Sequence, residues 1–168
     1  MAETHERDVL EFSLPNVGPG PDPRSLADLA NEDDFVAVYL QRDHLCTNCR
    51  KQVQQVADRY EQFRDRGAEV VSIVPEPRER VRSWQDSYDL PYPLLADPDA
   101  TAGETFDQPV RFGFLGDLSD FLGRMPEVVV VDGRGDDPTV AWSYSGRSTF
   151  DRPSVDDVLA AVDDLREA

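Results

Sequence analysis

Two cysteines, Cys46 and Cys49, are the residues of this 168-residue chain whose type and spacing most directly suggest chemistry. They are the only cysteines in the sequence, and Thr47 and Asn48 separate them. Two thiols at this spacing can join in a redox-active disulfide, and they can also supply two of the four ligands of a zinc site. The neighbouring sequence has to distinguish these uses.

The pair lies between a predicted strand and a predicted helix. Residues 35–40 (FVAVYL) form an apolar run that is typical of a strand buried on both faces. After a short turn, apolar residues recur three and four positions apart, which predicts one buried face of a helix: Cys49, Val53, Val56, Tyr60 and Phe63. Cys46 and Cys49 are therefore expected side by side at the amino end of this helix, where unpaired backbone N–H groups and the helix dipole stabilise a thiolate.

The charges around the pair support a thiolate. Asp and Glu make up 34 of the 168 residues, yet none occurs from His44 to Ala57, whereas Arg42, His44, Arg50 and Lys51 surround the cysteines. We expect Arg50 and His44 to be supporting residues of the site. An imidazole titrates near neutral pH, so His44 can tune the thiolate or act as a base, and a solvated side chain in the turn is the alternative.

The overall composition predicts one soluble domain, residues 1–168, with residues 1–8 as a loose tail. The net charge is −17, and the cations are sixteen Arg and one Lys. This balance predicts a protein from a halophile, with an ordinary acidic protein as the alternative, and it argues against nucleic acid as a partner. The sequence has no apolar run of membrane-spanning length and no recognisable leader, so we expect a cytoplasmic location and no membrane partner.

The rest of the pattern alternates between strands and helices. Strands are expected at 9–14, 69–74, 93–96, 127–131 and 139–145. Helices are expected after Ser25, from Cys46 without interruption to Gly67, from Pro77, from about Asp99 through Phe106, and after Ser154. This order predicts an α/β fold with a central mixed β-sheet, helices on both faces and an N-terminal strand extension. Cys46 would lie at the carboxyl end of a strand, where ligands bind in such sheets.

Five stretches resemble the thioredoxin-like superfamily, and within it the redoxin or AhpC/TSA-type peroxiredoxin-like family. They cover nearly the whole chain from residue 9 and read EFSLPNVG, CTNCRKQ, RGAEVVSIVPEPRERVRSWQDSYDLPYPLLADPD, MPEVVVVDGRG and RPSVDDVL. The resemblance implies a thioredoxin-like fold and thiol chemistry without a cofactor or metal. Pro126 resembles the cis-proline that abuts the CxxC pair in this superfamily. Arg124 would approach the thiolate, or else lie on the surface.

The resemblance implies two versions of the reaction. In a thiol-disulfide oxidoreductase Cys46 attacks a protein disulfide and Cys49 resolves, although Leu45 stands where thioredoxins have Trp and Leu40 where they have a buried acid. In a peroxiredoxin Cys49 reduces a hydroperoxide and Cys46 resolves, although Cys46 then occupies the position of a Thr and Arg42 that of a Pro. We expect the first version. Both need an external thiol reductant, and the family leaves room for a homodimer.

Two further interpretations remain open. A structural zinc site would need two more ligands, and the only histidines are His5 and His44. A redox-inactive binding protein would keep the fold and use residues 107–125, a stretch with three Gly and three Phe, as its contact surface. In an active enzyme the same stretch would be a flap over the site, or a folded loop that closes the core.

Overall fold

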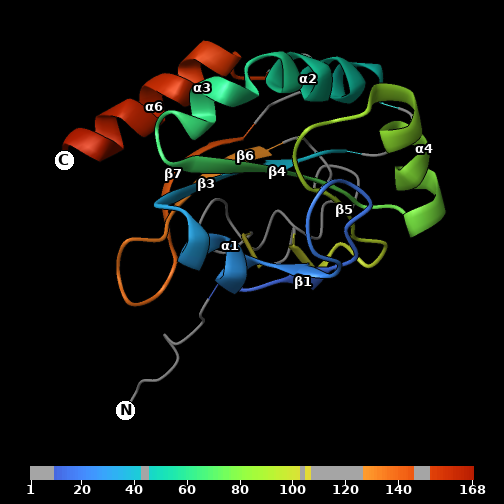
Figure 1. The fold of residues 1–168 in the computed structure, drawn as a ribbon, viewed down its shortest axis with the longest axis horizontal. Helices are drawn as coiled ribbons and strands as arrows, with labels where there is room; N and C mark the ends of the chain where they lie inside the picture. Colours follow the sequence, from blue (N-terminus) through green and yellow to red (C-terminus); the bar gives the residue numbers. More distant parts are fainter. Residues whose placement is uncertain (1–9, 43–45, 103–104, 107–126, 146–151) are drawn as a thin grey trace.

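A five-stranded mixed sheet forms the centre of the molecule (Figure 1). The computed structural model describes residues 10–42, 46–102, 105–106, 127–145 and 152–168. Within them the strand order is β5-β4-β3-β6-β7, with parallel pairing from β5 to β3 and antiparallel pairing from β3 to β7. The strands are β3 (Phe35–Leu40), β4 (Ala68–Val74), β5 (Leu94–Ala96), β6 (Glu127–Asp132) and β7 (Thr139–Ser145).

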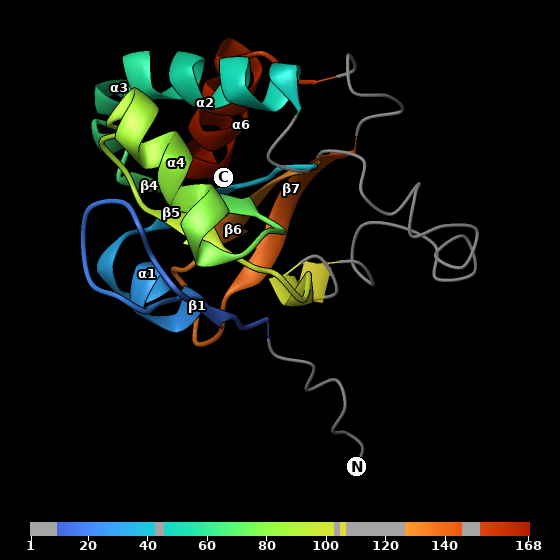
Figure 2. The same cartoon turned by 90° about the vertical axis from the view of Figure 1, so that its right-hand side faces the viewer.

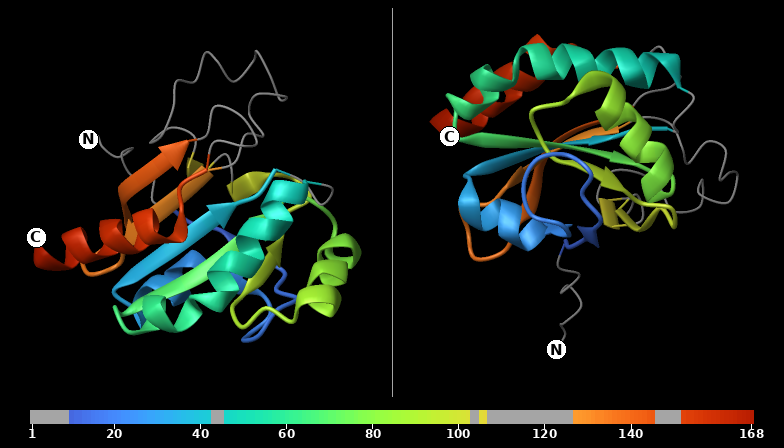
Figure 3. Two further views of the ribbon diagram at one scale, coloured as in Figure 1. Left: turned by 90° about the horizontal axis from the view of Figure 1, so that it is seen from above. Right: turned by 45° about the vertical axis from the view of Figure 1, so that its right-hand side comes forward.

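Helices cover both faces of this sheet, as the sequence predicts. Figures 1 and 3 show one face covered by α2 (Thr47–Asp58), α3 (Tyr60–Arg64), α4 (Arg78–Tyr88) and α6 (Val155–Glu167), and the other by α1 (Leu26–Glu32). Every residue of β3 and β4 is buried between these layers, which is why these strands are almost entirely apolar. None of the helices in the described part of the chain combines the length and hydrophobicity needed to cross a membrane.

The alternation of side chains along β3 divides the core into two clusters. Phe35, Ala37 and Tyr39 pack with residues of α2 and α6, including both cysteines. The intervening residues Val36, Val38 and Leu40 pack with α1 on the opposite face. Successive side chains of a strand point to opposite faces, so this division identifies the α2 face of the sheet as the face of the cysteine pair.

The N-terminal extension is shorter than predicted. β1 (Ser13–Leu14) pairs with β2 (Arg24–Ser25) in a separate two-stranded antiparallel sheet. The expected strand over 9–14 is therefore wrong for residues 10–12, which belong to no strand. Phe12 and Leu14 are both buried against the α1 side of the core, so burial alone accounts for the alternation that suggested a longer strand.

The uninterrupted helix expected from Cys46 to Gly67 is also wrong. The chain breaks at Arg59, which has φ −112° and ψ 13°, and α3 begins at Tyr60. The apolar period runs through the break because Val56 of α2 and Phe63 of α3 bury their side chains in the same cluster. Gly67 follows α3 and adopts the left-handed conformation expected of a helix cap, with φ +73°.

Side-chain caps are found at the starts of two other predicted helices. Ser25 caps α1 by accepting a hydrogen bond from the N–H of Asp28. Ser154 and Asp157 form the reciprocal capping box of α6. Several predictions fall outside the described residues: the loose tail over 1–8, His44, Arg124, the cis bond at Pro126 and the role of residues 107–125.

Candidate active site

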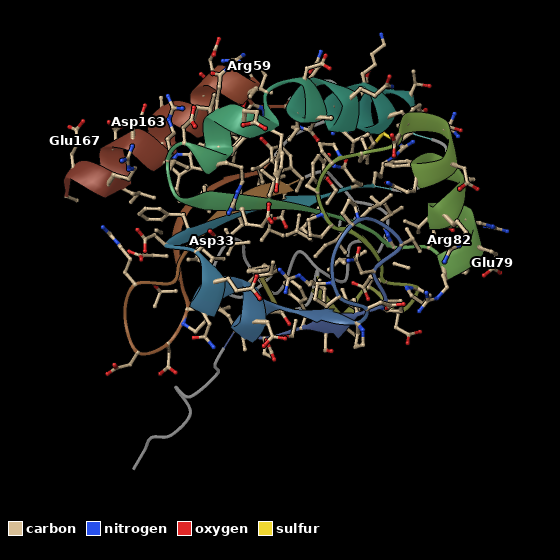
Figure 4. The ribbon with its side chains drawn as sticks, viewed as in Figure 1. Asp33, Arg59, Glu79, Arg82, Asp163 and Glu167 are labelled. Carbon is tan, nitrogen blue, oxygen red and sulfur yellow. A yellow bond between two sulfur atoms is a disulfide. The ribbon has the colours of Figure 1, made fainter. Side chains whose placement is uncertain are left out.

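The end of β3 and the beginning of α2 position the two cysteines. Cys46 is the N-cap residue of α2, and its Sγ accepts a hydrogen bond of 3.2 Å from the N–H of Cys49. Cys46 and Cys49 form a disulfide, and their Cα atoms are 5.2 Å apart. The sulfur atoms are visible at the start of α2 in Figure 4. The first turn of the helix thus supplies a backbone donor to Cys46 Sγ, as expected for a site that stabilises a thiolate.

A guanidinium group from a distant part of the chain lies against both sulfurs. Nη2 of Arg152 donates to Cys46 Sγ at 3.2 Å and to Cys49 Sγ at 3.0 Å. Nη1 of the same side chain donates to Oε1 of Gln52 at 3.0 Å. Gln52 is buried one turn beyond Cys49 in α2, so it holds the plane of the guanidinium in place. Such donors stabilise a sulfur anion more than a neutral sulfur, because hydrogen bonds to charged groups are stronger.

Arg42 adds a backbone donor and positive charge. Its N–H donates to Cys49 Sγ at 3.4 Å, so each sulfur of the pair receives one backbone N–H and one guanidinium N–H. Burial lowers the pKa of Arg152 to about 10, and the positive charge of Arg42 acts in the same direction. Arg152 therefore remains protonated at neutral pH and presents a charged group to the sulfurs.

The cysteine pair is enclosed by protein. The relative exposure of Cys46 is 2% and that of Cys49 is 0%. A bulky substrate has no direct access to the sulfurs in this conformation, whereas a molecule of a few atoms needs much less displacement of the surrounding chain. The low exposure of the two cysteines therefore favours a small substrate over a bulky one.

Only part of the predicted set of site residues can be compared with the structure. Cys46 and Cys49 are joined at the predicted helix end, and Arg50 is half-buried in the first turn of α2. Lys51 is exposed. In the described part of the chain there is no group of three or more His, Cys, Asp or Glu side chains arranged to hold a metal ion.

Arg152 is the functional residue that sequence reasoning missed. It is separated from Cys49 by 103 positions, so no local spacing connects them. The strand order, once known, indicates which distant segment lies near the cysteines. β6 begins opposite Leu40, the last residue of β3, and β7 ends opposite the beginning of β6. The chain after β7 therefore starts from the same edge of the sheet as the cysteines, and a basic residue before α6 is a candidate for the site.

Comparison with known protein families gives a match over most of the chain. A family model described as the AhpC/TSA family matches residues 6–136. Peroxiredoxin Q, chloroplastic, from Sedum lineare is 31% identical over 102 residues, which are 60% of this chain and 50% of that protein. Thiol-disulfide oxidoreductase ResA from Bacillus subtilis (strain 168) is 29% identical over 72 residues, which are 42% of this chain and 40% of that protein. The chain thus spans half or less of the length of these two relatives.

Solved structures extend the match to nearly the whole fold. Peroxidoxin BcpB from Mycobacterium tuberculosis superimposes with a TM-score of 0.71 at 23% identity, covering 94% of this chain and 95% of the other. The reduced 2-Cys peroxiredoxin of Plasmodium vivax gives a TM-score of 0.74 at 14% identity and covers 94% and 79%, respectively. At these identities the similarity establishes the fold, which is the thioredoxin fold of peroxiredoxins.

Proposed function

The chain belongs to the AhpC/TSA family, and from this membership and the geometry of its cysteine pair we propose that it is a thiol-based oxidoreductase that reduces hydroperoxides. The observation that carries the proposal is the enclosed Cys46–Cys49 disulfide with Arg152 bonded to both sulfurs. A hydroperoxide is the smaller of the candidate substrates, so it needs the least displacement of the chain to reach sulfurs that are 2% and 0% exposed. The peroxiredoxin name of the Sedum lineare relative supports the same substrate class.

In the proposed reaction the hydroperoxide first oxidises Cys49, and only then does another cysteine attack it. Its thiolate attacks the terminal oxygen of the hydroperoxide, so that an S–O bond forms, the O–O bond breaks, and the leaving alkoxide takes up a proton to become an alcohol or water. Cys49 is then a sulfenic acid. Cys46 attacks this sulfur, the disulfide forms, and hydroxide leaves as water after protonation. An external dithiol reductant returns the two electrons and reopens the disulfide.

Donors at Cys49 fit this role. The N–H of Arg42 and the guanidinium of Arg152 both donate to Cys49 Sγ. They would stabilise the thiolate before the attack. The charge of Arg152 would also stabilise negative charge that develops on the peroxide oxygens during O–O cleavage.

A second candidate is reduction of a disulfide with Cys46 as the nucleophile, the version that we expected from the sequence. Cys46 caps α2 and accepts the Cys49 N–H, which is the arrangement of an activated thiolate at a helix end. Cys46 would form a mixed disulfide with one half of the substrate and release the other half as a thiolate. Cys49 would then attack Cys46 and release the remaining half. The relative ResA carries the name of this activity.

Serine variants separate the two candidates. Hydroperoxide consumption and insulin-disulfide reduction are measured for the reduced wild type, C46S and C49S. If Cys49 is peroxidatic, C46S consumes one equivalent of hydroperoxide and accumulates a sulfenic acid that dimedone traps, whereas C49S does not react faster than a free thiol. Wild-type protein should turn over with an external dithiol.

Two outcomes would contradict this assignment. Insulin reduction that depends on Cys46, without hydroperoxide consumption, would establish the second candidate instead. A wild-type pair that forms no disulfide under mild oxidant and consumes no hydroperoxide would leave a redox-inactive binding protein. Metal analysis of the purified protein, with zinc near one equivalent, would support the structural zinc site.

A further inference from the structure

The buried side-chain amide of Gln41 finds no hydrogen-bond partner among the described residues. The residue is 5% exposed, and in the part of the chain that the structure describes neither Nε2 nor Oε1 has a partner. Two buried and unpaired polar atoms on one side chain are uncommon, because nearly all buried polar atoms in proteins are hydrogen-bonded. Each such group also costs free energy on folding. An apolar residue would stabilise the fold better, so this amide calls for a functional explanation.

The position of Gln41 places the amide on the face of the cysteine pair. Its backbone N–H donates to the carbonyl of Ile73 at 2.9 Å, so the pairing of β3 with β4 continues one residue beyond Leu40. Leu40 packs on the α1 side and Tyr39 on the α2 side, and alternation returns Gln41 to the α2 side. The next residue, Arg42, contacts Cys49 Sγ through its N–H. Gln41 therefore directly precedes the residue whose backbone contacts Cys49 Sγ, on the face of the sheet that carries the cysteine pair.

A primary amide has the chemistry that a hydroperoxide needs. Its NH₂ group donates and its carbonyl oxygen accepts, whereas a hydroperoxide presents one O–H donor and two acceptor oxygens. The two groups that donate to Cys49 Sγ from outside its own helix, the N–H of Arg42 and the guanidinium of Arg152, are donors only. The Oε1 of Gln52 is already occupied by Arg152. Gln41 is thus the neighbour that can accept the O–H and donate to an oxygen of the same molecule.

We propose that the Gln41 amide binds the hydroperoxide beside Cys49, with Oε1 accepting the O–H and Nε2 donating to a peroxide oxygen. The inference rests on the proposed hydroperoxide reduction and makes Gln41 the residue that positions the substrate. Among the described residues the amide has no partner in the free protein, and substrate binding completes its hydrogen bonds. A site built to hydrogen-bond a substrate loses stability in the empty state and gains selectivity for molecules that satisfy it.

The experiment replaces the amide by an apolar group of similar size, Gln41→Leu, with Gln41→Met as a second variant. Two second-order rates are measured on the reduced proteins: oxidation by hydrogen peroxide and alkylation by iodoacetamide. Iodoacetamide reports the reactivity of the sulfurs and lacks the O–O–H group. We expect the peroxide rate to fall about ten-fold or more and the iodoacetamide rate to change less than two-fold. The melting temperature should stay equal or rise, because an unpaired buried amide has been removed.

Tyr39→Phe is the matched control. The Tyr39 hydroxyl is also buried and unpaired among the described residues, but it lies two residues deeper in β3 and close to Tyr92. Its removal should leave both rates unchanged. A peroxide rate that falls no more than the iodoacetamide rate in both Gln41 variants would overturn the inference. A wild-type peroxide rate no faster than that of a free thiol would instead overturn the proposed function.

Discussion

At the scale of single residues, one guanidinium group serves both sulfurs of the redox pair. Arg152 is fixed by Gln52 and donates from the same nitrogen to Cys46 and Cys49. The shared donor means that the negative charge can move from one sulfur to the other during the reaction without leaving its hydrogen-bond partner. A fork with several donors suits this task better than the single ammonium group of a lysine.

Removal of this group should lower the reactivity of the thiols. In Arg152→Met the side chain keeps its approximate length but loses its charge and donors. Hydrogen bonds to charged groups contribute about 1.5 to 3 kcal/mol, so alkylation of the reduced protein by iodoacetamide at pH 7 should slow at least about ten-fold. The pH profile of alkylation should move to higher pH, since less thiolate is present at neutrality. Rates measured between pH 5 and pH 10 test this.

Two other variants serve as controls for Arg152. Arg152→Lys keeps the charge and should give an intermediate profile. Arg166→Met removes an exposed charge near the end of α6, the helix that follows Arg152, and it should leave the profile unchanged because Arg166 contacts Asp163 on the surface. An Arg152→Met profile that coincides with that of the wild type would contradict the role of the guanidinium.

At the scale of elements, the site depends on how α2 and α6 dock side by side on one face of the sheet. Figure 2 shows both helices on the same side, opposite α1 and β1. Arg59, at the break between α2 and α3, forms an ion pair of 2.6 Å with Asp156 in the first turn of α6. Arg66 pairs with Asp163 further along α6. The break after α2 therefore lets α3 run alongside α6. This docking brings the chain segment that precedes α6 to the cysteines.

The turn that ends α3 should be sensitive to its glycine. Gly67 has φ +73° and connects α3 to β4. A side chain in the left-handed region costs about 1 to 2 kcal/mol, so Gly67→Ala should lower the free energy of unfolding by about 1 kcal/mol in urea denaturation.

Gly135 provides the matched control. A Cβ atom there would meet no other atom within 4 Å, and its φ lies outside the left-handed range. Gly135→Ala should therefore be close to neutral. Equal stability losses in the two variants would show that the left-handed conformation of Gly67 is not the cause.

At the scale of the whole molecule, the dominant property is the net charge of −17. Figure 4 shows charged side chains on the outer surfaces of the helices, among them Glu79 and Arg82 on α4 and Asp163 and Glu167 on α6. Exposed ion pairs contribute little stability, so they do not cancel the repulsion of the excess carboxylates. A halophilic origin remains a prediction, and it implies that the folded protein depends on salt.

Salt should therefore stabilise the protein. The screening length falls from about 10 Å at 0.1 M to about 3 Å at 1 M salt, which removes most of the repulsion between surface carboxylates. We expect the melting temperature to rise between 0.1 M and 2 M NaCl, with most of the rise complete by about 1 M. Sucrose, which does not screen charge, should not reproduce a rise that saturates in this range. A melting temperature that stays constant or falls with NaCl would refute the argument.

Much of the architecture follows from local patterns that need no knowledge of the fold. The apolar runs of β3 and β4, the caps at Ser25 and Ser154 and the redox pair at a helix end are all properties of residues close together in the chain. Hydrophobic period and capping chemistry act over a few residues, so these features can be predicted from sequence alone. The same patterns do not reveal the break at Arg59, because the apolar stripe continues through it.

The composition of the site, in contrast, follows from long-range pairing. Arg152 reaches the sulfurs because β6 runs antiparallel to β3 and β7 runs antiparallel to β6, which returns the chain to the edge where α2 begins. The Gln41 amide, which has no partner among the described residues, is recognisable only in the folded chain, where the residue is 5% exposed. Contacts between residues about a hundred positions apart depend on strand order and helix docking, and no local spacing in the chain records either of them.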